Sequence, residues 1–330
     1  KPLDSTLKNL SGKFSFINGD LQSEPLTASW FNQPLNVDFS TKEGAKAYQV
    51  AVNLNGNWQP AKTGVLPVAV NEALSGSVAW DGKVGIDLPY HAGATYNVEL
   101  NGDLKNVSSH LPSPLAKPAG EPLAVNVKVD GNLNSFELTG QAGADNHFNS
   151  RWLLGQKLTL DRAIWAADSK TLPPLPEQSG VELNMPPMNG AEWLALFQKG
   201  AAESVGGAAS FPQHITLRTP MLSLGNQQWN NLSIVSQPTA NGTLVEAQGR
   251  EINATLAIIT HRGWRISNIF ITTQAWRKLV VIQHSHHLSR QRNALTSVAG
   301  QTHKYDAQSA GSGGKNSVVL TVISPFLAIR

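Results

Sequence analysis

The stretch Leu123–Gly143, LAVNVKVDGNLNSFELTGQAG, sets the pattern for most of the chain. Its apolar residues alternate with polar ones on both sides of Asp130-Gly131; they are Val125, Val127, Val129, Phe136 and Leu138. A period of two places alternate side chains on opposite faces of a β-sheet. Asp-Gly favours the positive φ angles of a type I′ turn. The stretch therefore predicts a β-hairpin with one apolar face.

The same pattern recurs along the first 257 residues, and each copy contains an Asn-Gly or Asp-Gly dipeptide. The segment AYQVAVNLNGNW (47–58) is echoed by YNVELNG (96–102). The apolar residues of these copies that would share the predicted face are Val50, Val52, Leu54, Val98 and Leu100. The dipeptides, which the pattern predicts to be hairpin turns, are Asn18-Gly19, Asn55-Gly56, Asp81-Gly82, Asn101-Gly102, Asp130-Gly131 and Asn241-Gly242. The fold class predicted is all-β.

Two segments interrupt the strand pattern. Residues 111–122, LPSPLAKPAGEP, contain four prolines, which cannot donate a hydrogen bond within a sheet, so they predict a loop that is also a soft boundary. Residues 189–200, NGAEWLALFQKG, predict one short amphipathic helix with Asn189 as its N-cap and Gly200 as its C-cap. Its apolar residues are Trp193, Leu194, Leu196 and Phe197. A core plug or end cap is favoured over a membrane-surface helix, because Lys199 alone supplies basic charge.

Charge divides the chain near Ala257. Residues 258–330 contain nine of the 26 basic residues and one of the 23 acidic residues, a net charge of +8, while residues 1–257 carry −5. Such a break indicates a different kind of segment. We predict that residues 258–330 are an atypical, poorly ordered basic tail produced by a shifted reading frame or a truncation. A genuine basic extension is the competing interpretation, and it would attract nucleic-acid phosphate.

Several functional classes receive little support. The chain has 330 residues, 15% of them charged, and no cysteine, which excludes disulfides and thiolate metal sites and suits an oxidising compartment. It contains no sequence motif of a hydrolase, a zinc protease or a dinucleotide-binding site. His284, His286, His287 and His303 lack an accompanying carboxylate or thiolate, so a metal site is disfavoured. We predict no enzymatic activity, no cofactor, no metal and no nucleic-acid partner.

Several parts of the sequence resemble the AsmA-like family of Gram-negative bacteria. They are the strand repeats of residues 11–140, the proline-rich LPPLPEQSGVELNMPP, the helix GAEWLALF and the later LSIVSQPTANGTLVEAQGREINATLA. The resemblance covers Lys1 to about Ala257. It implies a long, bent groove of short antiparallel strands with an apolar inner face, similar to the bridge-like lipid transfer proteins. Members are anchored in the inner membrane, extend through the periplasm and take part in moving phospholipid toward the outer membrane.

The resemblance therefore implies a segment of a periplasmic bridge. Phospholipid acyl chains would be its cargo, the two membranes would lie at the ends of the full-length protein, and the anchor would be an N-terminal segment absent from this chain. The groove lining would be the apolar residues named above, with no catalytic residue. From the residues alone, a secreted β-sandwich with a closed core, acting in binding or adhesion, is favoured, because an apolar sheet face normally needs a covering layer. The resemblance reverses this preference and makes the sandwich the alternative.

Overall fold

The computed structural model describes residues 6–64, 66–203, 209–240, 242–261, 264–272 and 317–325. They fall into two compact units, Lys1–Pro238 and Thr239–Arg330. The first unit is mostly strand, as predicted: β1 Lys8–Ser11, β2 Phe14–Ile17, β3 Asp20–Ser23, β4 Leu26–Trp30, β5 Gln33–Glu43, β6 Ala47–Trp58, β7 Leu74–Gly76, β8 Val78–Pro89, β9 Thr95–Asp103, β10 Val107–Ser109, β11 Ala124–Asn132, β12 Ser135–Ala142, β13 Asn146–Leu154, β14 Leu158–Ala167, β15 Gly180–Asn184, β16 Met188–Asn189, β17 Ala209–Ser210, β18 Ile215–Leu224 and β19 Gln227–Thr239.

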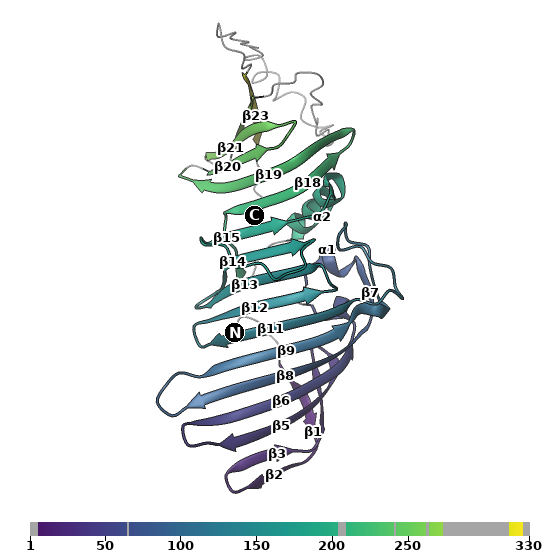
Figure 1. Cartoon of the computed structure of the whole chain (residues 1–330), viewed down its shortest axis with the longest axis vertical. Helices are drawn as coiled ribbons and strands as arrows, with labels where there is room; N and C mark the ends of the chain where they lie inside the picture. Colours follow the sequence, from purple (N-terminus) through teal and green to yellow (C-terminus); the bar gives the residue numbers. More distant parts are fainter. Residues whose placement is uncertain are drawn as a thin grey trace. The chain divides into compact units, whose positions relative to one another are not determined.

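These strands form one large sheet, in which the strands of the first unit lie side by side in succession (Figure 1). The two short strands β7 and β10 form a separate pair. A sandwich requires two stacked sheets, and the described strands of this unit do not provide a second large one. The closed-core alternative is therefore wrong for this unit.

Most neighbouring strands are antiparallel, as predicted, and parallel pairs occur around residues 158–224. There β14 pairs in parallel with β15 and β17, and β18 pairs in parallel with β15 and β16. Parallel neighbours cannot be joined by a hairpin and need a crossover connection. The segments between these strands, residues 168–179 and 185–214, supply those crossovers, and this is why they lack the hairpin pattern.

The helices differ in part from the prediction. The helix α2, Gly190–Glu203, begins where predicted: Asn189 Oδ1 accepts a hydrogen bond from the Ala191 backbone N–H at 3.1 Å, and Asn189 Nδ2 donates to Glu192 Oε1 at 2.8 Å. It continues past the predicted C-cap Gly200. A second short helix, α1, Val68–Asn71, was not predicted. Two short 3₁₀ helices, η1 Pro60–Lys62 and η2 Leu104–Asn106, complete the first unit.

Three excursions from the strand ladder meet at one edge of the sheet, where α1, α2 and β7 lie together (Figure 1). One of them is the crossover between β15 and β18 that contains α2. Residues 59–77 leave β6 and return to β8, and residues 104–123 leave β9 and return to β11. The proline-rich loop belongs to the second of these, and β9 and β11 pair directly from Asp103↔Ala124 to Thr95↔Asn132. Lys199 of α2 forms an ion pair with Glu72, which follows α1, and Trp193 Nε1 donates to the Ser113 carbonyl oxygen at 3.1 Å.

The predicted turn positions are mostly wrong. Asn18-Gly19 does form a type I′ turn, with φ of 54° and 92°. Asn55-Gly56, Asp81-Gly82, Asn101-Gly102 and Asp130-Gly131 instead lie inside β6, β8, β9 and β11. In each the Asn or Asp lies on the polar face and the glycine on the apolar face. A Cβ added to Gly131 would lie 2.5 Å from Cζ of Tyr96, so the glycine makes room for a ring lying across the strand.

The second unit contains β20 Gly242–Gln248, β21 Asn253–His261, β22 Trp264–Thr272 and β23 Ser317–Pro325, paired antiparallel in that order. The strand β21 continues across the predicted boundary at 257/258. Asn241 and the four tail histidines, His284, His286, His287 and His303, lie outside the described residues, as does most of the predicted poorly ordered tail. The origin of residues 258–330 stays a prediction.

Candidate functional site

All the predicted groove residues lie on one face of the sheet, because each is paired directly with another apolar residue or with a glycine. One row runs across five strands in succession through Val52, Val84, Val98, Val129 and Leu138. A neighbouring row contains Leu54, Gly82, Leu100, Val127 and Gly140. We call the surface formed by these rows the apolar face. The register of the paired strands makes this face continuous over five strands. The sequence alone could predict an apolar face only within each single repeat, not its continuation from one repeat to the next.

The apolar face is only half-buried. The predicted groove residues are all half-buried, and none of them is fully buried. They are Val50, Val52, Leu54, Val98, Leu100, Val125, Val127, Val129, Phe136 and Leu138. Among the described residues no large side chain is completely buried. In an ordinary globular domain such a surface would be covered by a second layer. Here it is an extended apolar surface available to an apolar molecule.

Four aromatic side chains gather at one end of the strands β4, β6 and β8. The rings of Trp30 and Phe31 stack with centroids 4.9 Å apart, and Trp58 meets Trp80 edge to face at 4.7 Å. The Trp58 indole donates to the Pro34 carbonyl oxygen at 2.7 Å, which fixes its orientation.

These rings surround a cavity of about 500 Å³ that we call the aromatic pocket. Its lining is apolar apart from Thr63 and the indole N–H groups; the residues are Trp30, Phe31, Leu54, Trp58, Pro60, Thr63, Leu66, Trp80, Val84, Val98 and Leu100. A second cavity of about 350 Å³ shares Trp30 and Leu54 and continues over Leu35, Val37 and Val52. Both belong to the apolar face.

A different part of the apolar face is covered by the protein itself. Trp193 of α2 packs against Trp165 of β14 with ring centroids 6.4 Å apart, over Ala167, Met185 and Met188. We call this cluster the covered patch. The prediction that the helix plugs a core is thus supported for Trp193. Leu194 is 45% exposed, and the side chain of Phe197 lies outside the described residues.

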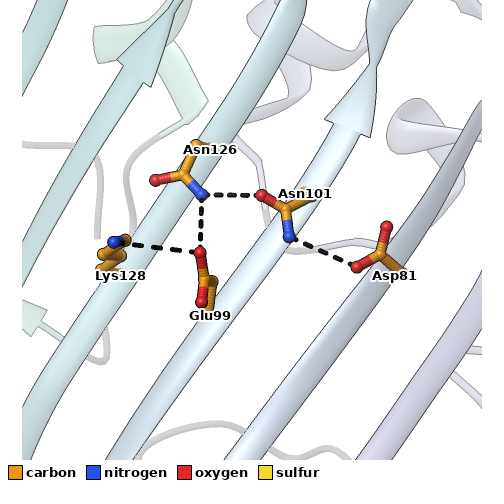
Figure 2. Close-up of polar contacts among 5 residues, drawn as sticks. All are labelled: Asp81, Glu99, Asn101, Asn126 and Lys128. Carbon is orange, nitrogen blue, oxygen red and sulfur yellow. Dashed lines mark hydrogen bonds and ion pairs between the residues drawn. The ribbon is translucent and has the colours of Figure 1, made fainter.

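The opposite face of the sheet is polar and its side chains bond across strands. Asn126 Nδ2 donates to Asn101 Oδ1 at 2.7 Å and lies 3.4 Å from Glu99 Oε1, while Asn101 Nδ2 reaches Asp81 Oδ2 at 3.3 Å (Figure 2). Lys128 Nζ lies 3.9 Å from Glu99 Oε1. Cross-strand pairs of this kind stabilise a sheet and keep this face hydrated.

A third cavity, of about 450 Å³, lies at the other end of the strands and is polar by comparison. Asp130, Glu137 and Arg151 contribute charges to it, and Tyr96 contributes a ring. Burial raises the pKa of the Tyr96 hydroxyl above its ordinary value, so the group stays neutral at physiological pH. This cavity has no set of donors that could hold a metal: in the part of the chain that the structure describes, no three His, Asp or Glu side chains come together for one.

The aromatic pocket was not predicted from the sequence. Trp30 and Trp58 end β4 and β6, but Trp80, Trp152, Trp165 and Trp229 lie within strands. The pocket could have been predicted from aromatic residues that pair with glycines across neighbouring strands. Trp80 pairs with Gly56 on one side and with Gly102 on the other.

The sequence matches the YhdP protein family over residues 1–302. The chain belongs to the YhdP family. It is 96% identical over 269 residues to the intermembrane phospholipid transporter YhdP of Escherichia coli (strain K12), an alignment that covers 82% of this chain and 21% of that relative. The chain thus spans about a fifth of the length of the curated relative it matches. No solved structure matches the chain. The family resemblance seen in the sequence is confirmed.

The described residues contain no helix long and apolar enough to cross a membrane.

Proposed function

We propose that this chain is a segment of a periplasmic bridge, held to the inner membrane by the full-length protein, that carries phospholipid between the two membranes with the acyl chains against the apolar face. The observation that carries the proposal is the continuous, half-buried apolar face, with the row from Val52 to Leu138 crossing five strands. The YhdP family relative, named as an intermembrane phospholipid transporter, supports the same role.

The physical basis is burial. An acyl chain against the face removes apolar surface from water and gains about 25 cal/mol for each Å² that both partners bury. This attraction has no direction along the sheet, so a chain can shift from one row of side chains to the next at little cost. The polar face carries the Asn126 and Asn101 ladder and offers acyl chains no equivalent surface. Catalysis is not part of the proposal.

The test compares two adjacent residues of β11 that point to opposite faces. Val127→Asp places a carboxylate on the apolar face, where burial against acyl chains costs several kcal/mol; Lys128→Asp makes the same carboxylate on the exposed polar face. We expect both variants to stay folded, because water can hydrate the carboxylate at position 127 when no lipid is bound, and only Val127→Asp to lose lipid binding.

The measurement combines thermal unfolding with photocrosslinking to phospholipid from a photoreactive residue at position 127 or 128. Crosslinks from 127 and few from 128 are expected. Equal crosslinking from the two positions would contradict the proposal, and so would global unfolding of Val127→Asp in a chain that gives no crosslink at all.

A further inference from the structure

We propose that the aromatic pocket is a docking site for the end of a single phospholipid acyl chain, a discrete binding site on the apolar face. The inference rests on the proposed function and adds a site to it. The pocket is defined by Trp30, Phe31, Trp58 and Trp80 together with the apolar lining residues named in the description of the pocket.

The chemistry of the lining selects a hydrocarbon. The floor is formed by the sheet residues Leu54, Val84, Val98 and Leu100, and among the described residues no carboxylate, ammonium or guanidinium group lines the pocket. A phosphate or a headgroup would have no ionic partner in this lining. Water would also be held poorly, because a bound water needs two to four polar partners. An apolar chain is the occupant that this lining favours.

The size of the pocket limits the occupant to one chain. Its volume of about 500 Å³ lies in the lower half of the range of roughly 300–1,000 Å³ found for sites that take one small ligand. A two-tailed phospholipid does not fit within it. One tail can enter while the other tail and the headgroup remain over the apolar face.

The pocket is continuous with the predicted groove. Leu54, Val98 and Leu100 belong both to the pocket and to the apolar face. Trp30 and Leu54 are also shared with the second cavity, which leads toward Leu35 and Val37. A tail moving along the face therefore meets the pocket without crossing a polar barrier, and Trp30 stands between the two cavities.

The turn that supplies one wall indicates a role beyond folding. Phe31 and Asn32 join β4 to β5 with φ of 49° and 57°, a type I′ turn. A bulky aromatic residue is a rare outlier at positive φ, and Asn or Gly is preferred at this position. Backbone strain of this kind clusters at ligand sites. In this unfavourable conformation the ring of Phe31 stacks on Trp30 and contacts Trp58 edge to face, with the ring centroids of Phe31 and Trp58 6.1 Å apart.

Two substitutions should change the pocket without disrupting the fold. Val84→Phe places a ring in the pocket itself, where there is room for it, and Phe31→Asn removes one wall while giving the turn a residue it prefers. We expect both variants to fold, with Phe31→Asn at least as stable as the parent. Val129→Phe is the matched control, because Val129 lies on the same face and lines none of the three cavities.

The probe is a lysophospholipid with a photoreactive diazirine at the end of its single acyl chain, and crosslinked residues are located by mass spectrometry. In the parent chain we expect crosslinks in residues 54–66 and 80–100, and also in residues 127–138 of the apolar face. Val84→Phe and Phe31→Asn should lower the first group at least fivefold and leave the second group unchanged. Val129→Phe should leave the first group unchanged.

The outcomes distinguish this inference from the proposed function. Crosslinks in residues 127–138 with none in the pocket, or pocket crosslinks that Val84→Phe and Val129→Phe reduce equally, would overturn the docking site and leave the bridge proposal intact. A parent chain that gives no crosslink anywhere overturns both.

Discussion

The aromatic pocket and the covered patch occupy the same face of one sheet, and they solve the problem of an exposed apolar surface in different ways. In the covered patch Trp193 of α2 packs on Trp165, so the protein supplies its own covering layer. In the aromatic pocket Trp58 is buried against Leu35 and Val37 and Trp80 packs beside it, yet a cavity of about 500 Å³ remains next to the rings. Similar side chains are thus covered by a helix in one place and border an open cavity in the other.

The difference arises from topology. The strands β8, β9 and β11 follow one another as antiparallel neighbours, and their connections lie beyond the strand ends. Between β15 and β18 the parallel pairing requires a crossover, and α2 lies in that crossover on the apolar face. A helix is present where the chain must travel back along the sheet, and the face remains uncovered where antiparallel neighbours are joined beyond the strand ends.

The largest effect that would test this comparison is expected from Trp193→Ala. The substitution removes the ring from the covered patch and its hydrogen bond to Ser113, and we expect a loss of about 3 kcal/mol in the free energy of unfolding. Leu194→Ala is the control, because Leu194 is 45% exposed and should change stability by no more than about 0.5 kcal/mol. Urea unfolding of both variants measures the difference. Equal losses would mean that α2 does not cover the patch.

A smaller effect is expected from Gly140→Ala, which tests how rings lie on the uncovered face. A Cβ on Gly140 would lie 1.9 Å from Cζ of Phe148, its partner on β13. The ring must move, and overpacking of this kind costs roughly 1–3 kcal/mol. Gly93→Ala has nothing within 4 Å of the added carbon and serves as the control. Thermal unfolding of the two variants decides, and an unchanged Gly140→Ala would show that Phe148 is not fixed over the strand.

The smallest effect is expected on the polar face, from Asn126→Ala. The substitution removes the bond to Asn101 at 2.7 Å and the contact with Glu99 (Figure 2), and a cross-strand bond of this kind contributes about 1 kcal/mol. Lys128→Ala, which loses only an exposed ion pair at 3.9 Å, should cost less than about 0.5 kcal/mol. If Lys128→Ala proved as destabilising as Asn126→Ala in urea unfolding, the amide ladder would not be what supports this part of the sheet.

The sequence predicted the strands and their apolar face well, because alternation is a local property. Val125, Val127 and Val129 share a face whatever follows them. The turns were predicted less well, because the dipeptide Asp130-Gly131 is compatible with two structures. It can form a hairpin turn, or it can lie within a strand with Asp130 on the polar face and Gly131 under the ring of Tyr96. Only the partner strand distinguishes them.

The parallel strands and the aromatic pocket could not be predicted from local patterns. The strand β15 has the composition of any short strand, and its parallel partners are fixed by crossovers whose path depends on tertiary contacts. The pocket unites Trp30, Trp58 and Trp80 from three strands with Leu66 from an excursion. Their meeting depends on the register of the sheet, which no single stretch of sequence contains.

The contacts between the excursions have a consequence for cooperativity. In a sheet whose strands touch mainly their immediate neighbours, unfolding can proceed in nearly independent blocks, as in repeat proteins. Here the Lys199–Glu72 ion pair joins residues 127 positions apart, the Trp193–Ser113 bond joins residues 80 positions apart, and β7 pairs with β10. The ion pair and the hydrogen bond tie the block from β6 to β11 to the crossover between β15 and β18, while the β7–β10 pair joins two excursions within the first block. We therefore expect the two blocks to unfold as one unit. In Trp193→Ala the two blocks should separate, and amide hydrogen exchange in β8 and β9 would then no longer follow exchange in β15 and β18.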